Sequence, residues 1–311
     1  MGETMLDRLL APGALRVVFQ PILQYDQSGW RVHALEALVR GPRGTHMEFP
    51  DVLFEYVRRK GAEVAMDRQC LAAVLRGARA LGTDITLSVN VHAATLEQDG
   101  DFVDFLAEQV QEVGRSPAHV IIEVVEPSPP WAGRGFGRAL EQFRERGFPI
   151  ALDDVGLGQS NFRMILECRP DYFKMDAFLI QGAHTDYYRR AVLRSIVDLA
   201  GSFGATAVAE GLDSVEDLRI VLDEGVRVVQ GYLLARPVAA RVLGSTDLLV
   251  HAADRLPVAF DEPATLASTD WLSHATKGVL ELCGDVHVGT TGCGRLAEPT
   301  TASPVLKEKV G

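Results

Sequence analysis

Residues 206–234, TAVAEGLDSVEDLRIVLDEGVRVVQGYLL, contain two short apolar strands joined by one amphipathic helix. The helix is expected to begin after Ser214, because the hydroxyl of this residue precedes an acidic residue by three positions, as in an N-terminal capping box. Leu218 and Leu222 recur at helical spacing, and Gly225 is typical of a helix end. The segment therefore predicts one strand–helix–strand unit.

The same alternation of apolar strands and amphipathic stretches extends from the N-terminus to about residue 237. Residues 101–114, for example, place Phe102, Leu106 and Val110 on one side of a predicted helix. Eight strands separated by helices favour one closed TIM-type (β/α)8 barrel built from a parallel sheet, with an open parallel sheet as the alternative. The predicted strands are RVVFQPI (16–22), HALEALVR (33–40), ITLSVNV (85–91), VIIEVVE (120–126), PIALDDV (149–155), YFKMD (172–176), TAVAEGL (206–212) and VVQGYLL (228–234).

The domain organisation follows from where this alternation begins and ends. Residues 1–14 are expected to form an N-terminal lead, and residues 15–240 the barrel. After residue 240 the alternation of strands and helices stops. A weakly helical stretch follows, and then sequence rich in Gly, Thr, Ser and Pro. This composition predicts a short C-terminal extension over residues 241–311 that ends in a flexible tail. The sequence assigns it no function.

Composition narrows the range of partners. The chain has 31 Lys and Arg against 42 Asp and Glu, a net charge of −11. This balance argues against binding a nucleic-acid polymer or an anionic membrane, because both require clustered basic side chains. No apolar run approaches the ~18 residues of a membrane span, and the first residues carry acids where a signal peptide needs a basic region. A cytoplasmic protein is therefore expected. The four cysteines show neither metal-cage nor disulfide spacing.

Carboxylate and amide side chains recur near the C-terminal ends of the predicted strands. In a barrel these ends meet at one face, where catalytic groups of this architecture lie. Each residue alone has an ordinary explanation, such as a helix cap or a surface amine, and Asp176 and His92 are given no other role. The joint pattern is different, because independent caps are not expected at nearly every strand end. The residues that form it are Glu36, Asn90, Glu123, Glu126, Asp153, Asp154, Lys174, Glu210 and Gln230.

So many acids beside one lysine require neutralising charge, and divalent cations are its simplest source. The implied ligands are hard oxygens without Cys or His, which indicates Mg²⁺ or Mn²⁺ rather than zinc. The adjacent pair Asp153 and Asp154 suits two neighbouring ions, since one carboxylate can bridge both while the other holds the second. A two-ion site at ~3.5–4 Å spacing is the usual arrangement for attack of hydroxide on phosphorus.

Several motifs follow one another in order along residues 15–237. They are FQPI (19–22), EALVR (36–40), SVN (88–90), IIEVVE (121–126), LDDVGLG (152–158), FKMD (173–176), AEGLD (209–213) and QGYLLARP (230–237). This ordered set resembles the EAL domain, the cyclic-di-GMP-specific phosphodiesterase family. The resemblance implies a TIM-type barrel of the EAL kind that hydrolyses cyclic di-GMP to linear pGpG in bacterial second-messenger signalling. It also implies two Mg²⁺ or Mn²⁺ ions and a homodimer.

The resemblance further implies roles for individual residues. The first ion would be held by Glu36, Asn90, Glu123 and Asp153. The second ion would be held by Asp153, Asp154 and Glu210. Lys174 would steady the attacking water or the developing charge on phosphorus, so that the catalytic residues would be Lys174, Glu36 and Glu210. Substrate contacts would come from Gln20, Leu38, Arg40, Asp154 and Lys174. Support for the site and its loops would come from Glu126, Asp213 and Gln230.

The chain departs from the family pattern at three places. Asp213 stands where Glu is usual, Val125 stands where Thr is usual, and the loop DVGLGQSNF (154–162) differs at several positions. The side chain of Asp213 is one methylene shorter than that of Glu, so its carboxylate would hold the neighbouring groups of the site less firmly. An EAL module that binds cyclic di-GMP or a protein partner without turnover is therefore the alternative function. A third hypothesis is another metal-dependent chemistry, with Lys174 abstracting a proton beside a carbonyl.

Overall fold

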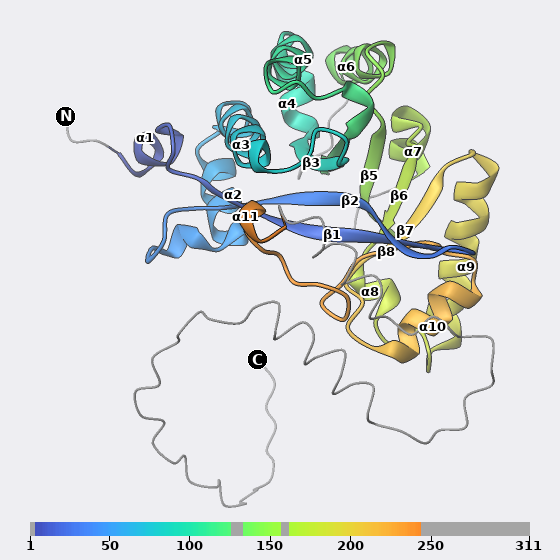
Figure 1. The fold of residues 1–311 in the computed structure, drawn as a ribbon. Coiled ribbons are helices and arrows are strands. Elements are labelled where there is room, and N and C mark those ends of the chain that lie inside the picture. Colours follow the sequence, from blue (N-terminus) through green and yellow to red (C-terminus); the bar gives the residue numbers. More distant parts are fainter. Residues whose placement is uncertain (1–3, 126–132, 157–161, 244–311) are drawn as a thin grey trace, which may run out of the picture.

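The computed structural model describes residues 4–125, 133–156 and 162–243. Eight strands close into a barrel in the order β1 to β8, and helices lie outside it (Figure 1). The predicted TIM-type barrel is therefore confirmed, and the open-sheet alternative is wrong. No helix in the described ranges is long and apolar enough to cross a membrane. The strands are β1 (Arg16–Asp26), β2 (Gly29–Arg40), β3 (Leu87–His92), β4 (Val120–Val125), β5 (Ile150–Val155), β6 (Tyr172–Met175), β7 (Thr206–Ala209) and β8 (Val228–Val229).

Strand β1 runs antiparallel to both of its neighbours, β2 and β8, whereas the other adjacent strands pair in parallel. The prediction of a wholly parallel sheet is wrong on this point. Only Gln27 and Ser28 separate β1 from β2. Such a short link closes an antiparallel hairpin, because a parallel crossover needs about a dozen residues or more. The register places Gln20 on β1 opposite Glu36 on β2.

Helices follow most of the strands, and the longer ones bury an apolar face. The helix expected after Ser214 is α10, and the Ser214 hydroxyl accepts a hydrogen bond from the backbone of Asp217 at 3.2 Å, which confirms the predicted cap. The predicted stripe of Phe102, Leu106 and Val110 is buried on α5. The α-helices are α1 (Met5–Leu10), α2 (Pro50–Arg59), α3 (Glu63–Gly77), α4 (Ala93–Gln98), α5 (Phe102–Glu112), α6 (Arg134–Glu145), α7 (Phe162–Cys168), α8 (Ala177–Ile180), α9 (Tyr187–Ser202), α10 (Val215–Asp223) and α11 (Ala240–Leu243).

A small apolar cluster, separate from the main core, is made by residues of six strands and no helix, so it fills the barrel interior. Its members are Ile22, Ala34, Ile121, Ala151, Val208 and Val228, with Tyr172 packed against it. Side chains two positions apart on a strand point to the same face of the sheet. The residues two positions after these apolar residues of β2, β4, β5, β6, β7 and β8 therefore form the next interior layer. They are Glu36, Glu123, Asp153, Lys174, Glu210 and Gln230.

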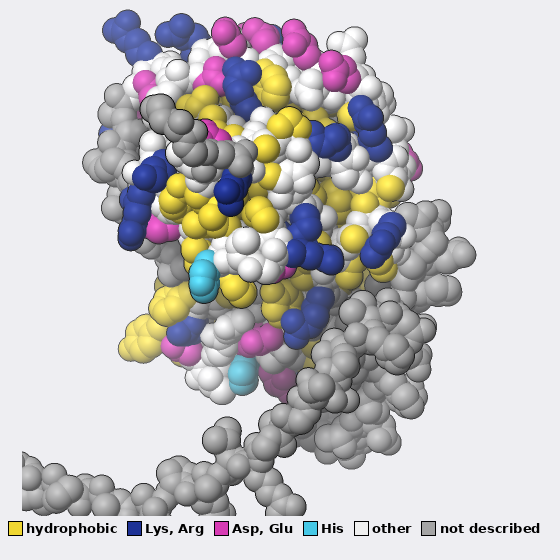
Figure 2. All heavy atoms as spheres, turned by 90° about the vertical axis from the view of Figure 1, so that its left-hand side faces the viewer, with side chains coloured by type: hydrophobic (Ala, Val, Ile, Leu, Met, Phe, Trp, Pro, Cys, Tyr) yellow, Lys and Arg dark blue, Asp and Glu magenta, His cyan; other side chains and the backbone are white. Residues whose placement is uncertain are grey.

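Both ends of the described chain pack onto the barrel. The predicted N-terminal lead contains α1, whose Leu9 is fully buried. Beyond β8 the chain returns to β1, where Phe19 and Val238 exchange backbone hydrogen bonds. Figure 2 shows the face on the side of α1 and α2, where Lys and Arg side chains are interspersed with hydrophobic and acidic ones. The predicted supporting residue Glu126, most of the departing loop and residues 244–311 lie outside the described residues.

Candidate active site

Charged side chains from β2, β4, β5, β6 and the end of β7 converge inside one end of the barrel. Single oxygens of Glu123, Asp153 and Glu210 all lie within 4.8 Å of one another. Glu36 lies beside them, because its Oε1 is 4.0 Å from the ammonium of Lys174. The structure thus brings together most of the acids that the strand-end pattern singled out, and the two-residue alternation of the strands explains why.

Lys174 lies at the centre of this cluster and is only 2% exposed. Its Nζ lies 2.6 Å from Glu210 Oε1 and 3.5 Å from Asp153 Oδ1, and it also donates a hydrogen bond to Glu123 Oε1. One ammonium therefore faces several carboxylates. The centre retains an excess of negative charge whenever those carboxylates are ionised.

The protonation of the cluster reflects that excess. Burial raises the pKa of Glu123 to about 8, with Glu36 and Asp153 adding to the rise and Lys174 opposing it. Burial likewise raises the pKa of Glu210 well above its ordinary value. Burial alone would lower the pKa of Lys174, but the surrounding carboxylates outweigh it and raise that pKa well above its usual range. Without added cations the cluster therefore holds protons on buried carboxyl groups near neutral pH.

The donor set fits a hard divalent cation. Among the described residues, the buried atoms Asp153 Oδ1, Glu210 Oε1 and Gln230 Oε1 receive no hydrogen bond. Lys174 forms ion pairs with Asp153 Oδ1 and Glu210 Oε1, but the geometry of these two contacts is not that of a hydrogen bond. Buried oxygens without donors are costly, and carboxylate and amide oxygens are the ligands that Mg²⁺ and Mn²⁺ prefer. The residues present therefore suit such an ion.

Neighbouring polar groups fix the orientation of the carboxylates. Gln230 Nε2 donates to Glu36 Oε2 at 2.6 Å, and Asn90 Nδ2 donates to Glu36 Oε1 at 3.3 Å. On the adjacent strands, the Ser88 hydroxyl donates to Glu123 Oε2 at 2.7 Å. Sequence analysis missed Ser88, although it stands two positions before Asn90 on β3 and must therefore share its face.

Asp154 lies differently from its neighbour Asp153. Its side chain is exposed, and its φ of 53° is in the left-handed region, which is uncommon for a residue other than glycine. The pairing of β5 with β6 is irregular at this point, between Leu152 and Val155. The structure shows no oxygen of Asp154 within the Glu123, Asp153 and Glu210 group, so its role as a ligand stays a prediction.

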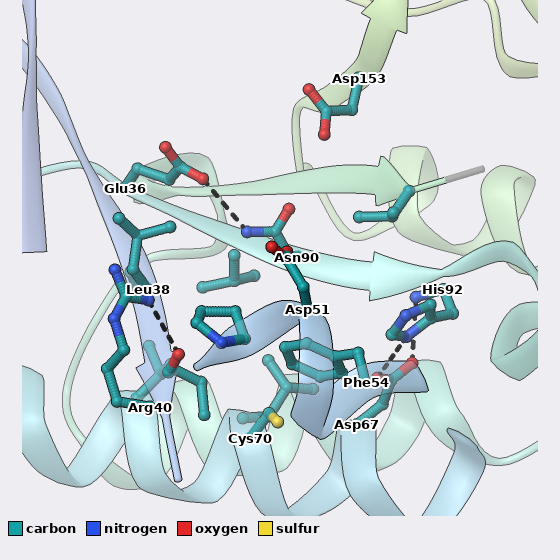
Figure 3. Close-up of a pocket in the computed structure, with 17 residues that line it drawn as sticks. Glu36, Leu38, Arg40, Asp51, Phe54, Asp67, Cys70, Asn90, His92 and Asp153 are labelled. Carbon is teal, nitrogen blue, oxygen red and sulfur yellow. Dashed lines mark hydrogen bonds and ion pairs between the residues drawn. The ribbon is translucent and has the colours of Figure 1, made fainter. Parts of the chain in front are cut away.

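Two cavities flank the carboxylates, and Glu36 and Leu38 line both. The larger, of about 410 Å³, also contains Arg40, whose guanidinium donates to the Val39 carbonyl at 2.9 Å (Figure 3). The smaller, of about 300 Å³, is lined by residues on the other side of the cluster. They include the predicted residues Gln20, Glu210, Asp213 and Gln230.

Sequence analysis assigned Asp176 and His92 only ordinary structural roles, and the structure places the two residues in different surroundings. Asp176 caps α8 by accepting from the backbone of Phe178 at 2.6 Å, as expected. His92 instead lines the larger cavity, where its Nδ1 lies 2.8 Å from the buried carboxylate of Asp67 (Figure 3). No sequence signal linked Asp67 to His92, because the two belong to different elements and only the fold brings them together.

Comparison with known proteins agrees with this geometry. Rv1354c of Mycobacterium tuberculosis, named as an uncharacterized protein, is 28% identical over 274 residues, which cover 86% of this chain and 42% of that protein. The cyclic di-GMP phosphodiesterase PdeR of Escherichia coli is 26% identical over 244 residues, which cover 76% of this chain and 36% of PdeR. The chain thus spans less than half the length of these relatives.

A solved structure of Klebsiella pneumoniae BlrP1, in complex with manganese and cyclic di-GMP at pH 6, matches with a TM-score of 0.66 and 28% identity. The match covers 74% of this chain and 57% of that chain. The family model described as the EAL domain matches residues 3–237. Since this match extends over most of the sequence, the chain belongs to the EAL domain family.

Proposed function

We propose that this chain is a metal-dependent phosphodiesterase that hydrolyses cyclic di-GMP to linear pGpG. The observation that carries the proposal is the convergence of Glu36, Glu123, Asp153 and Glu210 around one lysine inside the barrel end. Relatives named as cyclic di-GMP phosphodiesterases, and a relative solved with this nucleotide and manganese, support the choice of substrate.

Two Mg²⁺ or Mn²⁺ ions would be held by the acids and by the amide of this centre. When bound, they would lower the pKa of an attacking water and neutralise charge on the phosphate oxygens. Asp153 and Glu210 each have one buried carboxylate oxygen that receives no hydrogen bond. The proposed ligands are Glu36, Asn90, Glu123 and Asp153 for one ion, and Asp153, Asp154 and Glu210 for the other.

Lys174 supplies a fixed positive charge beside the reacting phosphate. Its burial among carboxylates keeps it protonated, so it stabilises the negative charge that develops on phosphorus rather than acting as a base. The same point weighs against proton abstraction by Lys174. Arg40, on the wall of the larger cavity, offers a planar guanidinium suited to a phosphate oxygen.

The two cavities suit a ligand that extends to both sides of the cluster. Both cavities share Glu36 and Leu38, so a molecule that reaches from one cavity into the other would lie beside these two residues. A cyclic dinucleotide has two bases on either side of a phosphodiester ring. We propose that the bases occupy the two cavities and that Gln20 and Leu38 contact the ligand between them.

We also propose that the chain forms a homodimer. Large apolar side chains are exposed on α7, α8 and the start of α9: Phe162 is 73% exposed, Phe178 56% and Tyr188 80%. These helices follow the neighbouring strands β5 and β6, so the residues belong to one side of the barrel. A second copy would remove this surface from water. Sedimentation equilibrium should give twice the mass of one chain, and a monomer at all concentrations would refute the proposal.

The decisive experiment is an assay of purified protein with cyclic di-GMP and Mn²⁺, followed by chromatography. The expected product is pGpG. Glu36→Ala should abolish turnover while leaving the circular dichroism spectrum unchanged, because Glu36 faces both cavities and the lysine. Glu112→Gln is a matched control on the exposed face of α5 and should retain full activity. Tight binding with the nucleotide recovered intact would instead identify a binding module without turnover.

A further inference from the structure

The segment from Glu210 to Ser214 joins β7 to α10 and carries one of the central carboxylates. Its first residue is anchored to the barrel, because the backbone of Glu210 donates to the Met175 carbonyl at 3.0 Å. After Glu210 the segment leaves the sheet and forms part of the wall of the smaller cavity. The contacts that fix residues 211–214 therefore lie directly beside Glu210.

The first tie is made by the turn that follows α8. Gln181 Nε2 donates to the Gly211 carbonyl at 2.8 Å. Gly211 has a φ of +65°, and a Cβ atom there would lie only 2.3 Å from the Cβ of Ala177. The segment thus lies directly on α8, in a conformation that favours glycine.

The second tie is made by Asp217, in the first turn of α10, which is only 2% exposed. Its carboxylate accepts from the backbone of Gly182 at 3.0 Å and from the backbone of His184 at 3.2 Å. The Nδ1 of His184 lies 2.8 Å from the same carboxylate, and the Ser214 hydroxyl donates to it at 2.8 Å. Asp217 therefore joins the turn after α8 to the end of the segment that begins at Glu210.

We propose that Asp217 is a positioning residue for Glu210. Together with Gln181, it adds ties at Gly211 and at Ser214 to the backbone hydrogen bonds that Leu212 makes with Gln230 and Leu233. The carboxylate of Asp217 does not touch the central cluster, so it acts only through this backbone. The inference rests on the proposed metal centre, because the position of Glu210 matters most for holding an ion.

Both carboxylate oxygens of Asp217 accept hydrogen bonds in this role. Burial raises its pKa, but the hydrogen bonds from His184, Gly182 and Ser214 outweigh burial and lower it, so the group stays ionised. An asparagine at this position keeps the shape but offers one acceptor oxygen in place of two. In either orientation of that amide, one of the two backbone donors, Gly182 at Oδ2 or His184 at Oδ1, would then face an amide nitrogen that cannot accept.

The other end of α10 offers a matched control. Glu224 accepts hydrogen bonds from Arg190 and Arg194 and so also ties α10 to its surroundings. It makes no hydrogen bond to residues 210–214 among those that the structure gives. Glu224→Gln therefore removes a comparable carboxylate anchor without affecting the segment that carries Glu210.

The test measures Mn²⁺ binding to metal-free protein by electron paramagnetic resonance, and amide hydrogen exchange of the same samples. Asp217→Asn should weaken Mn²⁺ binding about tenfold and speed exchange in residues 210–214. Glu224→Gln should leave Mn²⁺ affinity within about twofold of the unsubstituted protein, since its effect stays local. Gln181 is exposed, so Gln181→Ala should preserve the fold. This variant should weaken Mn²⁺ binding about threefold. If Asp217→Asn does not fold, Gln181→Ala tests whether the ties on residues 210–214 affect Mn²⁺ binding.

Faster exchange without a loss of affinity would overturn the inference, because the anchor would then be only structural. A loss of affinity without faster exchange would overturn it as well, because Asp217 would not act through this segment. If the unsubstituted protein binds no Mn²⁺, the proposed function fails. The exchange measurements then still show whether Asp217 fixes residues 210–214, so the two failures are distinguishable.

Discussion

Binding of Mn²⁺ to the metal-free protein should release protons, because the cation replaces protons on buried carboxyl groups. With a pKa of about 8, Glu123 is about nine-tenths protonated at pH 7. Burial also raises the pKa of Glu210 well above its ordinary value, so this carboxyl group adds to the number of protons released. We therefore expect release of at least about one proton per chain at pH 7 when both carboxylates become ligands. At pH 9 Glu123 is already ionised, so the number should fall by about one.

Isothermal titration calorimetry gives this number when the titration is repeated in buffers of different ionisation enthalpy. The slope of the observed enthalpy against the buffer enthalpy equals the protons released. Glu112→Gln, on the exposed face of α5, should give the same slope as the unsubstituted chain. Release of less than about half a proton at pH 7, with Mn²⁺ bound, would contradict the assignment of buried, protonated carboxyl groups to the ion.

Two further predictions concern substrate affinity and acid stability. Arg40→Ala should raise KM for cyclic di-GMP about 10- to 100-fold, because a charge-assisted hydrogen bond contributes about 1.5–3 kcal/mol. Steady-state kinetics measures this change, and an unchanged KM would show that Arg40 does not bind the phosphate. His33 bonds Gln24 and Tyr172 beneath the cluster, and burial, then the charge of Arg31, lower its pKa. The unfolded chain therefore takes up the proton first, so this contribution to stability is complete above pH 6.5 and is lost as pH falls through the lowered pKa. His33→Gln should reduce the drop in the free energy of unfolding between pH 7 and pH 5, as measured with urea, and an equal drop in both proteins would be the contrary result.

The barrel and its strand-end acids could be predicted because they follow from local patterns. Apolar runs of strand length alternate with helical stripes, and the right-handed crossover between them leaves few arrangements. The direction of β1 could not be seen in the same way. The predicted strands ended at Ile22 and began again at His33, so the prediction did not show that the two strands meet in a two-residue turn. The structure continues both strands to a turn at Gln27 and Ser28, which only an antiparallel hairpin can use.

The residues of the site likewise divide into those that a strand pattern predicts and those that it does not. A strand position fixes which face of the sheet a side chain occupies, so Ser88 could have been predicted from Asn90. Adjacency in sequence carries no such information for Asp153 and Asp154. Two consecutive strand residues face opposite sides, and in the structure Asp153 lies in the cluster while the side chain of Asp154 is exposed. Contacts between elements, such as His92 with Asp67, depend on the closed barrel and leave no local signal.

The layered interior of the barrel connects these observations. An apolar layer that includes Ala34, Ile121 and Ala151 excludes water from below the acids, and the strands then place Glu36, Glu123 and Asp153 directly above it. Acids in such a position cannot all ionise without a compensating charge, which is why burial is the main cause of the raised pKa values. The fold therefore favours either protons or divalent ions at this level, and proton-linked metal binding follows from the alternation of the strands rather than from any single residue.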